Sequence, residues 1–189
     1  YRNSILSILA PDCIIATVIH ASNGAIAREE LAAEARRLSR WFRLEFIYET
    51  GTTFEANFTE TLDRLAGESL VIVDDDGFCS VNAPRTLDFL RGMLLHLVEG
   101  YWVALDAIRV LLEEPMDQKD WIDYAREHGE KAFLQSDIYR AEAASTAIIK
   151  NALALLIEEG LVDKVRQGSG RRAKETLSIP EGVSLEDLA

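Results

Sequence analysis

The sequence predicts a mainly α fold of the α+β class, a helical domain with two small β-hairpins. Apolar residues recur at intervals of three or four through most of the chain, as they do on the buried face of a helix. Two runs of strand-forming residues are each followed by turn residues and a returning run, which is typical of hairpins. The chain has 189 residues, of which 48% are hydrophobic, so we expect one packed domain or two small ones rather than disorder.

Six segments have the periodicity of helices. In the second of them, Leu31, Ala35 and Phe42 fall on one face, and charged residues fall on the other. Pro11 lacks a backbone donor and clashes with the preceding turn, so we expect the first helix to bend or restart there. The predicted helices cover residues 1–20, 27–44, 54–65, 85–114, 118–134 and 141–158.

Each predicted hairpin directly follows an apolar helix. The hairpins join residues 70–73 to 78–81 and residues 161–165 to 175–179. The order of helix and hairpin, which occurs twice, allows two interpretations. It is the order of the last helix and wing of a winged-helix unit, or else each hairpin only covers the open end of a helix pair. We expect two subdomains, residues 1–83 and residues 84–189, each ending in a hairpin.

The formal charge of −12 argues against general binding to nucleic acids or to anionic membranes, because both depend on cationic residues. The second hairpin is a local exception with five cations: Lys164, Arg166, Arg171, Arg172 and Lys174. These residues are interpreted as a solvated wing. The alternatives are a docking surface for an acidic partner domain or for lipid headgroups and, less favoured, a contact with DNA.

Cys13 and Cys79 are isolated in apolar sequence, which favours buried, reduced thiols in a cytosolic compartment over a disulfide framework or a zinc site. Residues 5–21 form the most hydrophobic stretch. Pro11, Asp12 and a length below the roughly 20 apolar residues that a bilayer needs make it a poor membrane span. We expect a buried core helix or a surface that packs on another domain.

The sequence contains no complete catalytic centre. His20, His96 and His128 lie far apart, without metal-ligand spacing, and His96 is interpreted as a core residue. There is no G-x-S-x-G elbow and no glycine-rich phosphate loop. The run 74–77, Asp-Asp-Asp-Gly, lacks the spaced ligands of a calcium loop and is interpreted as a turn. We therefore predict no catalytic, cofactor-binding or metal-binding residue in this chain.

Several short motifs resemble glycerol-3-phosphate acyltransferases of the bacterial and mitochondrial membrane type. The start, Y-R-N-S-I-L-S-I-L-A-P-D, resembles the junction after the catalytic domain of that family. Three later motifs agree with its C-terminal region in order and spacing: L-V-E-G-Y-W at 97–102, A-E-A-A-S-T at 141–146 and K-N-A-L at 150–153.

The resemblance implies a non-catalytic C-terminal domain, cut from a longer polypeptide, that packs against the catalytic domain through the apolar residues 5–19. That domain would transfer an acyl group from acyl-CoA or acyl carrier protein to the first hydroxyl of glycerol 3-phosphate, the first step of phospholipid synthesis. The intact enzyme would lie at the cytoplasmic face of a membrane, the inner membrane in bacteria. Its base would be a histidine followed five positions later by aspartate. Here those positions hold Ala25, Tyr101 and Phe133, so we expect the fragment alone to be inactive.

Two other functions are open. One is a winged-helix module that binds nucleic acid or protein, although Lys150 is the only cation inside the helix before the second hairpin. The other is a free-standing helical interaction protein.

Overall fold

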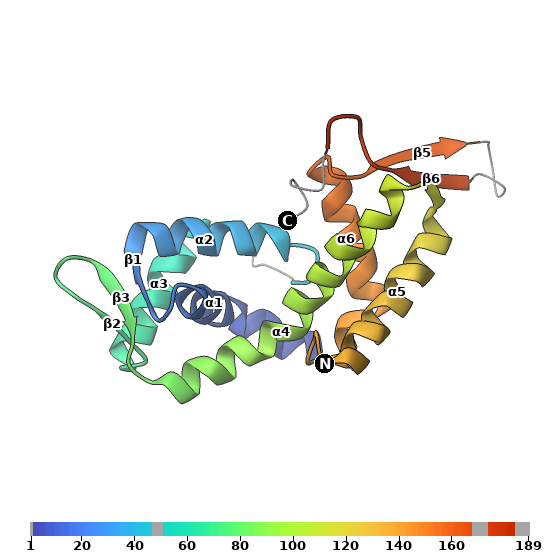
Figure 1. The fold of residues 1–189 in the computed structure, drawn as a ribbon. Helices are drawn as coiled ribbons and strands as arrows, with labels where there is room; N and C mark the ends of the chain where they lie inside the picture. The colour runs from blue at the N-terminus through green and yellow to red at the C-terminus, as the bar shows by residue number, and fades with distance from the viewer. Residues whose placement is uncertain (1, 47–50, 168–173, 184–189) are drawn as a thin grey trace. The chain divides into compact units, whose positions relative to one another are not determined.

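The computed structural model describes residues 2–46, 51–167 and 174–183, which form two compact units (Figure 1). Unit 1 is Tyr1–Leu95 and unit 2 is His96–Ala189. The units divide inside helix α4, Pro84–Ala107, and the boundary between residues 83 and 84 that the sequence predicts lies at the start of this helix.

Unit 1 is built on a central apolar helix, α1, with two further helices and a small sheet packed against it (Figure 1). Its elements, besides the first half of α4, are α1 (Arg2–Ala21), β1 (Ala25–Ala27), α2 (Arg28–Trp41), α3 (Phe54–Gly67), β2 (Val71–Val73) and β3 (Phe78–Val81). The strands form an antiparallel sheet in the order β1-β3-β2. Because α1 contacts α2, α3 and both β1 and β3, it has to be apolar on nearly every side.

Unit 2 repeats this plan around the second half of α4. Its other elements are a 3₁₀ turn η1 (Ile108–Leu112), β4 (Met116–Asp117), α5 (Gln118–Gln135), a 3₁₀ turn η2 (Ala141–Ala144), α6 (Thr146–Glu158), β5 (Asp163–Gln167) and β6 (Lys174–Ser178). The strands form an antiparallel sheet in the order β4-β6-β5. Trp121, Ile149 and Leu177, one from each of α5, α6 and β6, are completely buried in its core.

The two units share one topology: helix, strand, helix, helix, then a hairpin whose second strand lies in the middle of the sheet. This is the order of elements in a winged-helix unit. The mainly α fold with two small hairpins is therefore confirmed, and the winged-helix interpretation holds for both units. The third strand of each sheet was not predicted, because β1 (Ala-Ile-Ala) and β4 (Met-Asp) are short and lack the run of β-branched residues that marks β2. Segments this short have no period to detect.

Three helix predictions need correction. α1 continues through Pro11 without restarting, because packing on α2 and α3 outweighs the local cost of proline, and the bend that was the other expectation there stays a prediction. The long helix after Pro84 ends at Ala107 and tightens into η1. The segment predicted as one helix over 141–158 is divided at Ser145. This residue caps α6 by accepting a hydrogen bond from the backbone N–H of Ile148 at 3.5 Å.

Most of the apolar side chains of residues 5–19 pack in the core of unit 1. Ile14, Ile15, Val18 and Ile19 are all buried in its core, which confirms the expectation of a buried core helix, and the contact with another domain stays a prediction. Ile8, at 75% exposure, is the exception. No helix among the described residues is long and apolar enough to cross a membrane.

Candidate functional site

His20 and His128 each lie near a carboxylate, and His96 on α4 is half-buried and not among the core residues. His20 is exposed, and its Nδ1 lies 3.8 Å from Asp88 Oδ1. His128 on α5 is closer to its partner, with Nε2 2.8 Å from Asp106 Oδ2 on α4, and its ring stacks on Tyr124. This partnership could not be read from the sequence, because 22 residues separate the pair and only the packing of α4 on α5 brings them together.

The pair of His128 and Asp106 is better explained as structural than as catalytic. Asp106 Oδ1 also lies 3.4 Å from Arg109 Nε. The carboxylate therefore interacts with both His128 and Arg109. A general base needs a carboxylate on one ring nitrogen and room for substrate at the other. The pocket described below lies in unit 1 and does not include His128. Among the described residues, no group of three or more His, Cys, Asp or Glu side chains is placed to hold a metal ion.

The aspartate run is a turn, as predicted. Asp74 Oδ1 accepts hydrogen bonds from the backbone N–H groups of Asp76 at 3.1 Å and Phe78 at 2.7 Å. Gly77 adopts φ +80°, a left-handed conformation that favours glycine. One carboxylate therefore organises the turn between β2 and β3, in the manner of an Asx turn.

The basic cluster of the second hairpin lies only partly in the described residues. Lys164 on β5 pairs across the sheet with Glu175 on β6, with Nζ 2.9 Å from Oε2. Arg166 and Lys174 lie on the same two strands, and residues 171 and 172 are outside the described part. The observed ion pair agrees with a solvated wing.

The helix before each hairpin, which in a DNA-reading winged helix enters the groove, lacks the charge for that role. α3 carries Glu55, Glu60 and Asp63, and its Arg64 is paired with the buried Asp12 of α1. α6 carries only Lys150 as a cation. Since affinity for DNA depends on cationic neutralisation of phosphates, neither helix is suited to read it.

Both cysteines are buried, as the sequence predicted. Burial, and then the charge of neighbouring Asp12, raises the pKa of the Cys13 thiol to about 12. Burial likewise raises the pKa of Cys79 above its usual value. Both groups are therefore neutral thiols at physiological pH. The contribution of these neutral thiols to the stability of the folded protein is present below pH 9. It is lost as the pH rises towards the pKa of the thiol in the folded protein, because the thiols of the unfolded chain ionise first.

We expect both thiols to react slowly with a disulfide reagent at pH 8, because the thiolate is the nucleophile. The rate should rise by orders of magnitude in urea, where two thiols should react. A variant with Ala56→Cys, at an exposed position of α3, supplies a matched fast-reacting thiol in the folded chain. Modification of Cys13 in the folded protein as fast as that control would contradict the expectation.

The three later motifs that carry the family resemblance lie in unit 2, and two of them contact each other. Glu99, buried on α4, accepts hydrogen bonds from the backbone N–H groups of Tyr139 at 2.9 Å and Arg140 at 2.8 Å. The next residue, Gly100, lies against Ala143 of η2, where a Cβ atom at position 100 would be 2.9 Å from the carbonyl oxygen. The L-V-E-G motif and the A-E-A-A motif are thus two sides of one packed contact.

A second glycine completes this contact. A Cβ atom at Gly129 of α5 would lie 2.9 Å from the Cβ of Ala144 and 3.0 Å from a methyl group of Val103. Small residues on α5 and η2 therefore let the backbones approach closely. Close packing and hydrogen bonding to backbone N–H groups therefore give the motifs at 97–102 and 141–146 a structural role.

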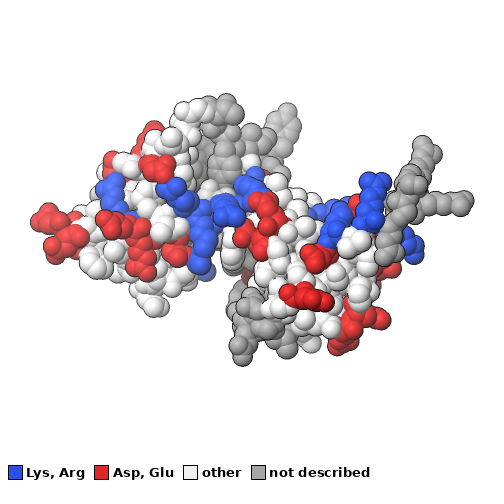
Figure 2. Space-filling view, turned by 90° about the horizontal axis from the view of Figure 1, so that it is seen from above, with Lys and Arg blue, Asp and Glu red and all other residues white. Residues whose placement is uncertain are grey.

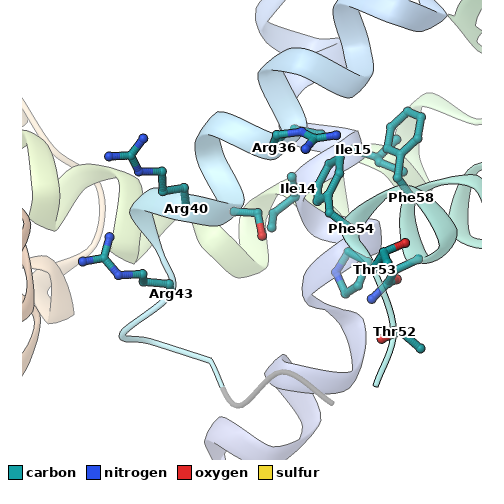
Figure 3. A pocket seen from close by; sticks show the side chains of 13 residues that line it. Ile14, Ile15, Arg36, Arg40, Arg43, Thr52, Thr53, Phe54 and Phe58 are labelled. Atoms are coloured by element: carbon teal, nitrogen blue, oxygen red, sulfur yellow. The ribbon is translucent and has the colours of Figure 1, made fainter. Parts of the chain in front are cut away.

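The most distinct pocket of unit 1 lies between α1, α2 and α3 and has a volume of about 320 Å³ (Figure 3). Its apolar wall comes from Pro11, Ile14 and Ile15 of α1 and from Phe54 and Phe58 of α3. The two phenylalanine rings stack with centroids 5.9 Å apart. The pocket arises because α1 presents bulky apolar residues where α2 presents small ones, Ala35 and Ser39.

The rim of this pocket is cationic. Arg36, Arg40 and Arg43 line it from α2 and from the residues that directly follow this helix, and the described lining contains no Asp or Glu. Arg36 lies over the Phe54 ring, 4.7 Å from its centroid, and pairs with Glu55 outside the lining. The backbone N–H of Glu55 and then Arg36 lower the pKa of that carboxyl group. This pocket could not be predicted from the sequence, because only the tertiary structure brings its residues from α1, α2 and α3 together.

Comparison with known proteins identifies the family. Residues 1–165 match the family described as the glycerol-3-phosphate acyltransferase C-terminal region, and the chain belongs to it. The chain is thus a member of this C-terminal-region family, and each of its two units has the order of elements of a winged helix.

Individual relatives agree with this assignment. A dihydroxyacetone phosphate acyltransferase of Mus musculus is 27% identical over 89% of this chain and 25% of its own length. The Homo sapiens protein of the same name is 24% identical over 87% and 24%, respectively. The acyltransferase plsB1 of Mycobacterium tuberculosis is 26% identical over 86% and 27%. The chain therefore spans about a quarter of the length of these relatives.

Proposed function

We propose that this chain is the non-catalytic C-terminal domain of a glycerol-3-phosphate 1-O-acyltransferase. The observation that carries the proposal is the match of residues 1–165 to the C-terminal region of that family. A preceding catalytic domain would transfer an acyl group from acyl-CoA or acyl carrier protein to glycerol 3-phosphate. It would act at the cytoplasmic face of a membrane. Dihydroxyacetone phosphate, named in several relatives, is the second candidate acceptor.

Exposed apolar residues of unit 2 support a role in packing against that domain. Leu134, at the end of α5, is 81% exposed, and Tyr139, just beyond it, is 75% exposed. Together with Phe133 they leave a patch of large apolar side chains near one end of the unit. Patches of this kind commonly mark sites of contact with another protein surface. This patch is a second candidate for the interdomain contact, besides residues 5–19.

The function as a nucleic-acid reader is not favoured, despite the winged-helix topology. The acidic α3 and the nearly uncharged α6 argue against it, and so does the net charge of −12.

The purified chain is expected to form no acylated product from acyl-CoA and either glycerol 3-phosphate or dihydroxyacetone phosphate. The reason is that general-base catalysis requires an oriented histidine beside the substrate hydroxyl, and we assign that histidine to the catalytic domain. The assay would follow transfer of a labelled acyl group, with a full-length relative as the positive control. Steady product formation by the chain, lost on His128→Ala, would refute the non-catalytic role.

A further inference from the structure

We propose that Asn23 is a site of spontaneous deamidation and that the C-terminal cap of α1 controls the rate of the reaction. Asn23 is directly followed by Gly24, and the two residues lie in the turn between α1 and β1. The inference rests on this turn and does not depend on the proposed function. It adds to unit 1 a modification site, at which asparagine becomes aspartate or isoaspartate.

The reaction needs only these two residues and water. The backbone nitrogen of Gly24 loses its proton and attacks the side-chain amide carbon of Asn23. A succinimide ring forms, and ammonia leaves. Water then opens the ring at either carbonyl group and gives aspartate or isoaspartate, each with one more negative charge than asparagine. Glycine favours the attack, because it has no Cβ atom that would crowd the nitrogen.

The turn has the geometry of a Schellman cap. Asn23 is exposed and has φ +57°, and Gly24 has φ +88°. The backbone N–H of Asn23 donates to the carbonyl oxygen of His20 at 3.1 Å, and that of Gly24 donates to the carbonyl oxygen of Ile19 at 2.9 Å. These two bonds define the motif, with asparagine at the left-handed position that glycine usually occupies.

This cap protects Asn23 from the reaction while it is closed. The nitrogen that has to attack is the one whose N–H donates to Ile19, and the Ile19 side chain is completely buried, which holds its carbonyl in place. The closed bond retains the proton and directs the nitrogen away from the Asn23 side chain. We therefore expect the reaction to proceed while the end of α1 is transiently open, since helix ends open more often than cores.

The products fit this turn less well than asparagine does. The carbonyl oxygen of Gly24 accepts a hydrogen bond from the backbone N–H of Val81 at 3.0 Å, so the turn also anchors β1 beside β3. Isoaspartate routes the main chain through the side-chain carbon, and the extra backbone atom moves the cap and this bond out of register. Aspartate keeps the backbone but places a negative charge at the C-terminal end of α1, where the helix dipole disfavours it.

The new charge would add to an acidic surface. The chain already carries a formal charge of −12. Figure 2 shows acidic side chains gathered at the end of unit 1 that holds the turn between β2 and β3 in Figure 1. The basic residue in the last turn of α1 is His20, whose Nδ1 already lies 3.8 Å from Asp88 Oδ1. Deamidation should therefore lower the stability of unit 1.

The test is incubation of the purified chain at mildly alkaline pH, in buffer and in urea, followed by peptide mapping with mass spectrometry. Each conversion at Asn23 adds about 1 Da, and chromatography separates the aspartate and isoaspartate peptides. In urea, Asn23 should be converted to a mixture of the two. The folded chain should react at least about tenfold more slowly, because the closed cap prevents the attack.

Two glycine variants separate opening of this cap from general destabilisation. Ser22→Gly loosens the residue before Asn23 and removes the hydrogen bond of its hydroxyl group. It should speed the reaction about two- to fivefold in the folded chain, the effect of a flexible glycine in a helix, but not in urea. The matched control is Glu68→Gly, since Glu68 precedes the left-handed Ser69 in a cap of the same kind on α3. That control should leave the rate at Asn23 within about twofold of the parent.

Two substitutions of Asn23 itself examine the product. Asn23→Gly removes the amide but keeps a residue suited to the left-handed position, so no conversion should occur there and the cap should remain intact. Asn23→Asp reproduces the aspartate product. It should unfold at a lower urea concentration than the parent and than Asn23→Gly, because of the charge at the helix end.

Absence of conversion at Asn23 in urea would overturn the assignment of the site. Equal rates in buffer and in urea would overturn control by the cap, and so would the same folded-state rate in Ser22→Gly and Glu68→Gly. An Asn23→Asp variant as stable as the parent would overturn the expected loss of stability.

Discussion

Replacing Gly100 by alanine is expected to destabilise unit 2 by about 2 kcal/mol, and replacing it by valine should cost more, as in other overpacked cores. The added Cβ would lie 2.4 Å from Cγ2 of Ile148 and 2.9 Å from the carbonyl oxygen of Ala143. Ile148 is held in the core of unit 2, and the carbonyl belongs to the backbone of η2, so neither can retreat freely. The clash outweighs the gain of up to about 1 kcal/mol in helix propensity.

Urea unfolding followed by circular dichroism and tryptophan fluorescence would measure the loss. Gly67→Ala is the matched control, because Gly67 also lies in a helix but has no other atom within 4 Å of its added Cβ. That variant should be neutral or slightly more stable. If Gly100→Ala left the free energy of unfolding as high as Gly67→Ala does, the close contact of α4 with η2 would be refuted.

Replacing Glu99 by alanine is expected to lower the free energy of unfolding by about 2–4 kcal/mol, since two charge-assisted hydrogen bonds are lost. The carboxylate is buried, and its two oxygens separately accept the N–H groups of Tyr139 and Arg140. Glutamine should restore only part of the stability, because its amide nitrogen cannot accept the second bond. The segment that leads into η2 should loosen first.

Hydrogen exchange gives a reading specific to this contact. The amides of Tyr139 and Arg140 should exchange at least about tenfold faster in Glu99→Ala, as expected when a hydrogen bond of this strength is removed. Glu127→Ala, at an exposed position of α5, is the control and should change neither stability nor exchange at those amides. Unchanged protection of both amides in Glu99→Ala would show that the carboxylate is not their partner in solution.

Glu99 and Gly100 connect the family resemblance in the sequence to a contact in the structure. Glu99 and Gly100 stand in the motif at 97–102, and Ala143 stands in the motif at 141–146. Helix α4 supplies a carboxylate and a glycine without a Cβ atom. The segment that leads into η2 supplies two backbone N–H groups, and η2 itself supplies a small side chain. These two motifs therefore mark a packing contact between α4 and η2 rather than an active site, which agrees with the proposed non-catalytic role.

The helices and the first hairpin could be predicted because each is specified by residues close in the chain. The boundary of α5 at Gln118 follows from Asp117, whose carboxylate accepts the Lys119 N–H at 2.9 Å. The turn after β2 follows from Asp74 and Gly77. Both depend on bonds that span four residues or fewer.

By itself, the sequence determined the fold class, the buried thiols, the aspartate turn and the family. Only the tertiary structure decided the third strand of each sheet, the continuous path of α1 through Pro11, the pairing of His128 with Asp106 and the pocket with its arginine rim. The physical reason is the range of the interactions. Helix periodicity, helix capping and turn formation depend on residues that are close in the sequence. Two-residue strands, cross-helix ion pairs and cavities exist only where packing brings distant segments together.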